Sequence, residues 1–66
     1  MIRYKAYLET TDRRIPVRAY RGWFHKSIPA ALRALERLHQ PGRGIVIPEG
    51  DDIHCPDWSR AHTIAL

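Results

Sequence analysis

The chain has 66 residues, 44% of them hydrophobic, and a formal net charge of +4. Residues 1–66 are expected to form one small domain, which buries roughly 60% of the surface of its unfolded chain, and the composition excludes a disordered tail. No stretch approaches the roughly 20 apolar residues of a membrane span, and the early charges of Arg3, Lys5 and Glu9 argue against a signal peptide.

Residues 2–10 alternate between an apolar and a polar face, with Ile2, Tyr4, Ala6 and Leu8 on the apolar side. This period of two is typical of a half-buried strand. Residues 15–21 repeat the pattern, and residues 10–14, Thr-Thr-Asp-Arg-Arg, predict a hairpin loop. Because Pro16 cannot donate to a ladder, we expect the second strand to lie at a sheet edge.

Charge favours one register for this hairpin. Pairing Leu8 with Val17 keeps the two apolar faces together, whereas a slip of two residues sets Lys5 against Arg18, a destabilising like-charge pair. We therefore predict the first register, in which the outer face carries two cation–aromatic pairs, Tyr7 opposite Arg18 and Lys5 opposite Tyr20.

A helix is predicted from Ile28 onward. Ser27 is a good N-cap, and a proline in the first turn, Pro29, removes no needed hydrogen bond. Pro41 and Gly42 end the helix. The apolar arc consists of Ile28, Ala31, Leu32, Leu35 and Leu38, with His39 half-buried at its edge, and the opposite face carries Arg33, Glu36, Arg37 and Gln40.

The C-terminal third predicts a second hairpin. Residues 45–47 are an apolar run typical of a buried strand, residues 49–52 form a turn, and residues 53–55 return as a short strand. Residues 57–66 are either a loose tail or an extra strand. We expect a two-layer α+β fold in β-β-α-β-β order, with one amphipathic helix packed on one face of an antiparallel sheet.

Charge is distributed unevenly along the chain. Residues 1–44 hold ten Lys or Arg and three acids, whereas residues 45–66 hold one Arg and four acids. This asymmetry indicates a basic face for an anionic partner. The predicted face is the outer side of the first hairpin, with its loop tip, and comprises Arg3, Lys5, Tyr7, Arg13, Arg14, Arg18 and Tyr20.

Such a face could bind nucleic acid, because rings stack on bases for about 1–3 kcal/mol each and cations neutralise phosphates. The alternative is a solvated strand face whose charges prevent edge aggregation. Lys26, Arg33 and Arg37 form a second basic stripe on the helix, partly compensated by Glu36. We expect this stripe on the opposite side of the sheet from the first, so that a partner uses one side only.

The histidines, the acids and the single cysteine do not predict a metal site, a cofactor or a catalytic residue. His54 and Cys55 are adjacent, so on a strand they would point to opposite faces, and structural zinc sites use other spacings. The acids of residues 49–57 fit a turn better than a cation site. One cysteine excludes an internal disulfide and favours a reducing, cytoplasmic setting.

Two tryptophans and a phenylalanine, Trp23, Phe24 and Trp58, are large for so short a chain and pack in the core or anchor an interface. Trp58 with Asp51 and Asp52 gives an alternative protein-binding face, typical of a protein-interaction module such as an antitoxin-like or regulatory subunit. A homodimer is a further option, since a second copy would supply core that the chain lacks.

In layout, residues 2–48 resemble small phage-encoded inhibitors of the anti-CRISPR type: one short domain, a hairpin followed by a helix, and a concentrated surface charge. The resemblance implies a stoichiometric, non-enzymatic blocker of a nucleic acid or nucleoprotein complex, for example a CRISPR effector. Because the chain is basic, it is a poor candidate for a DNA mimic.

Overall fold

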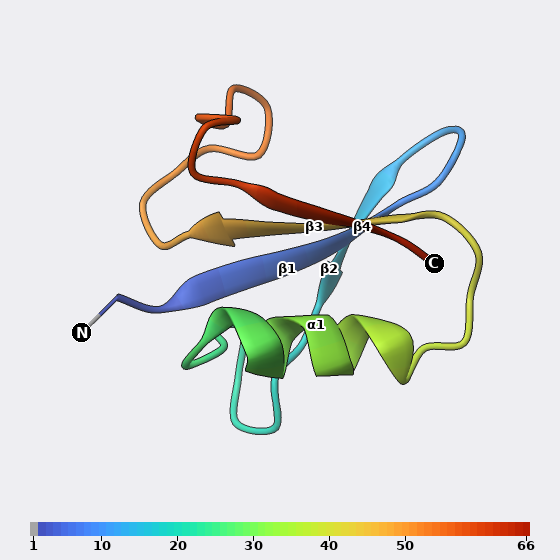
Figure 1. Cartoon of the computed structure of the whole chain (residues 1–66), viewed down its shortest axis with the longest axis horizontal. Helices are drawn as coiled ribbons and strands as arrows, with labels where there is room; N and C mark the ends of the chain where they lie inside the picture. Colours follow the sequence, from blue (N-terminus) through green and yellow to red (C-terminus); the bar gives the residue numbers. More distant parts are fainter. Residues whose placement is uncertain (1) are drawn as a thin grey trace.

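The computed structural model describes residues 2–66, which form one four-stranded antiparallel sheet and one helix (Figure 1). The strands lie in the order β2-β1-β3-β4, so β2 and β4 are the two edges. The predicted α+β fold is confirmed, as is the position of Pro16 on an edge strand. The elements are β1 (Tyr4–Glu9), β2 (Arg14–Val17), α1 (Ile28–Glu36), β3 (Arg43–Pro48) and β4 (His62–Ala65).

Helix α1 begins as its sequence predicts. The Ser27 hydroxyl oxygen accepts a hydrogen bond from the Ala30 N–H at 3.2 Å, and Ala31 and Leu35 are fully buried over β1 and β3. The helix ends at Glu36, earlier than Pro41 suggests. His39 has a φ of 52° and is exposed, so the prediction of a half-buried position for it is wrong.

The register of the first hairpin differs from the prediction. Ala6, rather than Leu8, lies opposite Val17, which is the register that charge repulsion between Lys5 and Arg18 disfavours. A short loop sets this register, because the Thr10 N–H donates to the Arg13 carbonyl at 2.8 Å. The like-charge contact does not arise, since β2 ends at Val17 before Arg18 could pair with β1.

The second strand is shorter than predicted because the chain leaves the sheet after Val17. A turn closed by the Ala19 N–H on the Gly22 carbonyl (2.7 Å) carries it outward, and Gly22 adopts a φ of +140° that favours glycine. The chain returns at His25, which exchanges two backbone hydrogen bonds with Tyr4. We call residues 18–24 the excursion loop.

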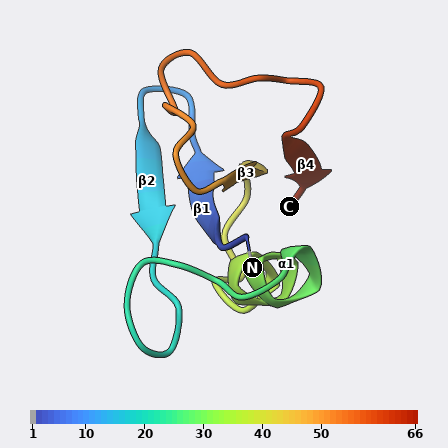
Figure 2. The same cartoon turned by 90° about the vertical axis from the view of Figure 1, so that its left-hand side faces the viewer.

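Residues 53–55 do not form the predicted strand, and of the two options for residues 57–66 the extra strand is found, as β4. Residues 49–61 contain turns and no strand. They cross the sheet on the side away from α1, and the chain re-enters the sheet as β4 (Figure 2). The Arg14 guanidinium donates a hydrogen bond to the Ile53 carbonyl at 2.7 Å, which attaches this segment to β2. Ile45 and Ile47 lie on the same side and are fully buried. We call residues 49–61 the cover segment.

Candidate functional site

On the outer sheet face, which is the side of the cover segment, the arginine side chains form ion pairs with nearby glutamates. Arg3 makes two hydrogen bonds to the Glu49 carboxylate, one of them 2.9 Å between Nε and Oε2. Glu9 accepts from Arg14 and also pairs with Arg43, each at 2.8 Å. These hydrogen bonds hold the pKa of Glu9 and of Glu49 below the ordinary carboxyl value. This face therefore offers little uncompensated charge to a partner.

Aromatic rings on and beside this face already have cationic neighbours. Arg3 and Lys5 lie 4.3 and 5.6 Å from the centre of the Phe24 ring, and Arg43 lies 5.5 Å from that of Trp58. Tyr7 is half-buried, and its pKa is raised by burial and by the nearby Asp52.

The prediction of an open, ring-studded sheet face is therefore wrong at Tyr7, because the cover segment lies over it. The other predicted residues are dispersed. Arg13 is exposed in the hairpin loop, whereas Arg18 and Tyr20 belong to the excursion loop and leave the strand face altogether.

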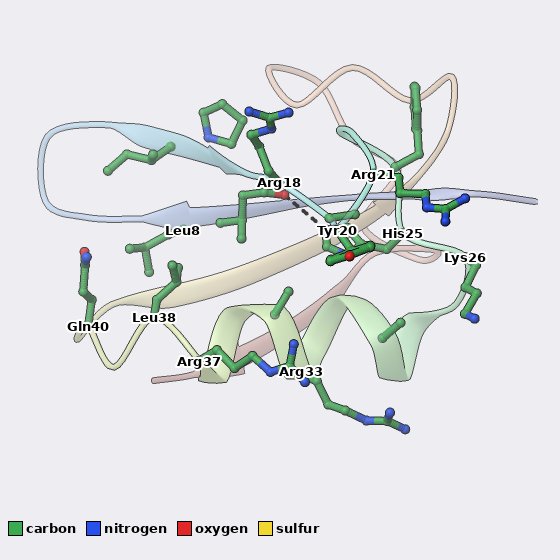
Figure 3. Close-up of a pocket in the computed structure, with 17 residues that line it drawn as sticks. Leu8, Arg18, Tyr20, Arg21, His25, Lys26, Arg33, Arg37, Leu38 and Gln40 are labelled. Carbon is green, nitrogen blue, oxygen red and sulfur yellow. Dashed lines mark hydrogen bonds between the residues drawn. The ribbon is translucent and has the colours of Figure 1, made fainter.

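A groove opens instead on the helix side of the sheet (Figure 3). Helix α1 lies over β1 and β3, and β2 with the excursion loop forms the facing wall. The groove has a volume of about 980 Å³. Its apolar lining includes Leu8, Ile15, Val17, Ala30, Ala34 and Leu38.

None of the residues that line this groove is acidic. Five of them are cations: Arg18, Arg21, Lys26, Arg33 and Arg37. None of the five makes an ion pair within residues 2–66. These five residues carry a formal charge of +5. The remainder of the chain has six basic and seven acidic residues, so its formal charge is −1. The groove therefore accounts for the whole net positive charge of the protein.

The groove joins two groups of residues that the sequence placed on opposite sides. The sequence predicts Arg18 on the hairpin face, and it predicts Lys26, Arg33 and Arg37 on the helix stripe. Because the chain turns outward after Val17, the excursion loop brings Arg18 round the sheet edge to the groove rim. The prediction that the two basic surfaces face away from each other is therefore wrong for Arg18, whereas Arg3 and Arg14 lie on the outer face, away from α1, as predicted.

Two groove residues were missed in the sequence. Arg21 lies in the turn of the excursion loop, whereas the sequence pattern predicts it at the end of a strand. His25 is 4% exposed, with its ring Nε2 at 3.1 Å from the Val17 carbonyl oxygen, where it braces the loop against β2. The signal for Arg21 was present, since residues 18–37 contain five cations and one acid, Glu36.

The residues of the alternative protein-binding face lie in the cover segment. Trp58 is 50% exposed and contacts Arg43, Asp51 is half-buried, and an Asp52 carboxylate oxygen accepts the His54 N–H at 2.9 Å. The Asp52 carboxylate thus organises its own turn.

Within residues 2–66, no three His, Cys, Asp or Glu side chains are grouped so that they could hold a metal ion. The helix described in that range is too short to cross a membrane. No family model, curated protein or solved structure matches the chain.

Proposed function

We propose that this protein is a non-enzymatic binding module that docks through its groove on nucleic acid, alone or within a nucleoprotein complex. The observation that carries the proposal is the set of five groove cations without an acidic partner. A concentration of charge with a low-dielectric wall attracts a polyanion and raises its local concentration. The proposed role is that of a stoichiometric inhibitor of the anti-CRISPR type, acting in the cytoplasm.

Arginine supports a phosphate partner in particular. Four of the five groove cations are arginines, whose planar guanidinium groups hold phosphate oxygens through two parallel hydrogen bonds. Arg33 and Arg37 lie one helical turn apart, which places their Cβ atoms about 5–6 Å from each other on one face. Both side chains are exposed. In Figure 3, Arg37 runs along α1 toward Arg33, whose side chain extends away from the helix. They can therefore engage neighbouring phosphates of one backbone.

Salt dependence gives the proposal a quantitative form. Each phosphate neutralised by the protein contributes about −0.7 to −0.9 to the slope of log K against log salt concentration. If all five groove cations are engaged, we expect a slope of about −3.5 to −4.5. Fluorescence anisotropy of a labelled oligonucleotide, titrated at several salt concentrations, measures it.

Paired variants locate the contact. The double substitution Arg33→Gln/Arg37→Gln removes two groove charges and should reduce the slope by about 1.4–1.8. Arg13→Gln/Arg60→Gln removes the same charge from exposed residues that do not line the groove and should leave the slope within about 0.5 of the wild type. Equal losses in the two variants, or no binding at low salt, would refute the proposal.

A second candidate function, the protein-interaction module, is favoured by one observation, the half-exposed ring of Trp58, which is not part of the groove lining. Trp and Arg are enriched in binding hot spots, and here both occur together as Trp58 and Arg43. Trp58→Ala distinguishes the two candidates: nucleic-acid binding should be unchanged, whereas a partner protein held by this ring would be lost.

A further inference from the structure

One aromatic residue beside the groove differs from the others in its surroundings. Tyr20 lies in the turn of the excursion loop and is 98% exposed, although Tyr is an amphipathic side chain that usually buries much of its ring. Within residues 2–66, the rings of Phe24, Trp23 and Trp58 each have a cation beside them, and Tyr20 does not. Both faces of its ring are therefore available.

Trp23 gives the same loop a second accessible ring. Trp23 is 51% exposed, and the Arg18 guanidinium lies 5.2 Å from the ring centre. A guanidinium beside an indole makes a flat surface that is both aromatic and cationic. The excursion loop thus presents two rings on a segment whose base is held by the hydrogen bonds between His25 and Tyr4.

Tyr20 lies next to the groove cations, whereas Trp23 is outside the groove lining and meets these cations only at Arg18. Tyr20 lines the groove together with Arg18 and Arg21 of the same loop, while Arg33 and Arg37 line the opposite wall (Figure 3). A polyanion in the groove would have its charged groups at the arginines and any flat uncharged groups within reach of Tyr20. A strand of nucleic acid has this alternation of phosphate and base.

We propose that the groove and the excursion loop together bind single-stranded nucleic acid, with an unpaired base stacked on Tyr20. This inference rests on the proposed function and specifies its substrate. Base faces in a duplex are covered by their neighbours, and exposing one costs a few kcal/mol of unstacking per step. An unpaired base stacks on a ring without that cost, as in other single-strand binding sites. The phosphate contacts alone would not distinguish the two forms.

Competition binding tests the preference. A labelled single-stranded oligonucleotide is displaced by the same unlabelled strand as DNA, the same strand as RNA, the matching duplex, or a poly-glutamate peptide of equal charge. We expect either single strand to compete at least about tenfold better than the duplex or the peptide. Either sugar form supports the proposal, since stacking uses the base.

Variants at the loop assign the contact to the ring. Because Tyr20 is almost fully exposed, its replacement should leave the fold intact. Tyr20→Ala should weaken single-strand binding about 5- to 150-fold and leave duplex binding nearly unchanged, whereas Tyr20→Phe, which keeps the ring, should bind within about twofold of the wild type. In a Trp58→Phe background, binding of the single strand should also quench the fluorescence of Trp23.

The outcomes separate this inference from the function on which it rests. Equal binding of single strand and duplex, with Tyr20→Ala silent, would overturn the single-strand inference and leave the groove as a general nucleic-acid site. Preference for the acidic peptide, or no nucleic-acid binding at low salt, would overturn both.

Discussion

Arginines on the two sides of the sheet have different neighbours. On the outer face, Arg3 is held by Glu49, and Arg14 and Arg43 share Glu9. In the groove, Arg33 and Arg37 have no acidic partner within residues 2–66. Exposed ion pairs of the first kind contribute only about 0–1 kcal/mol each, so their main consequence is to cancel charge.

The comparison shows why charge along a sequence and charge on a surface are different quantities. The basic segment, residues 1–44, contributes cations to both the outer face and the groove. Three of its arginines, Arg3, Arg14 and Arg43, form ion pairs with Glu49 or Glu9. The partner-binding surface is defined by the cations that remain.

The largest effects should come from the core on either side of the sheet. Leu35 of α1 is buried against the helix side of the sheet, and Ile47 is buried on the outer face. We expect Leu35→Ala and Ile47→Ala each to lower the free energy of unfolding by about 2–5 kcal/mol. Urea denaturation measures both. A loss below about 0.5 kcal/mol for Ile47→Ala would mean that the cover segment does not shield that face.

A smaller effect is expected at Gly44, where β3 passes under the helix. A Cβ at this position would lie 2.8 Å from both Ile64 Cγ2 and Leu35 Cδ1. Gly44→Ala should therefore lower the free energy of unfolding by about 1–3 kcal/mol through overpacking. Thr63→Ala, at an exposed residue on the neighbouring strand, should change it by less than about 0.5 kcal/mol. Equal stability of the two variants would contradict the packing described.

Lowering the pH should reduce the free energy of unfolding, because it protonates the paired carboxylates of the outer face. Because the hydrogen bond from Arg14 lowers the folded pKa of Glu9, the stability it contributes is present above the unfolded value of 4.5 and is lost as the pH falls through the folded pKa. Glu9→Gln should flatten the decline of stability with pH below 4.5, measured by urea denaturation, and Arg14→Gln/Arg43→Gln should do the same. An unchanged decline in both would show that these pairs do not form in solution.

The smallest expected effect is a change in the ultraviolet absorbance of Tyr7 as its phenol titrates. Burial and the nearby Asp52 raise its pKa, so the folded protein keeps this phenol protonated above pH 10. The stability that this contributes is present below pH 10 and is lost as the pH rises through the folded value. Ultraviolet titration should show a component above pH 10 that Tyr7→Phe removes, and its absence from the wild type would contradict the covered outer face.

Local signals in the sequence predicted the elements well. The cap at Ser27, the apolar period of the helix and the alternation of the first strand all depend on neighbours within a few residues, and each is found in the structure. The position of Pro16 on an edge follows from its missing N–H alone.

The candidate site could not be predicted in the same way, because it depends on contacts between distant segments. The hairpin register was set by the loop at Thr10 rather than by charge at Lys5, and β4 formed from the tail instead of from residues 53–55. The cover segment hides Tyr7 through a contact between Arg14 and Ile53, 39 residues apart. No short-range pattern encodes these pairings.

Heteronuclear NMR of the labelled protein, titrated with a single-stranded oligonucleotide at low salt, tests the central claim most directly. Binding in the groove predicts chemical-shift changes concentrated in residues 18–26 and 30–38, with the amides of the cover segment unchanged. Changes centred instead on residues 49–61 and the outer face of β1 would contradict the assignment of the binding surface to the groove.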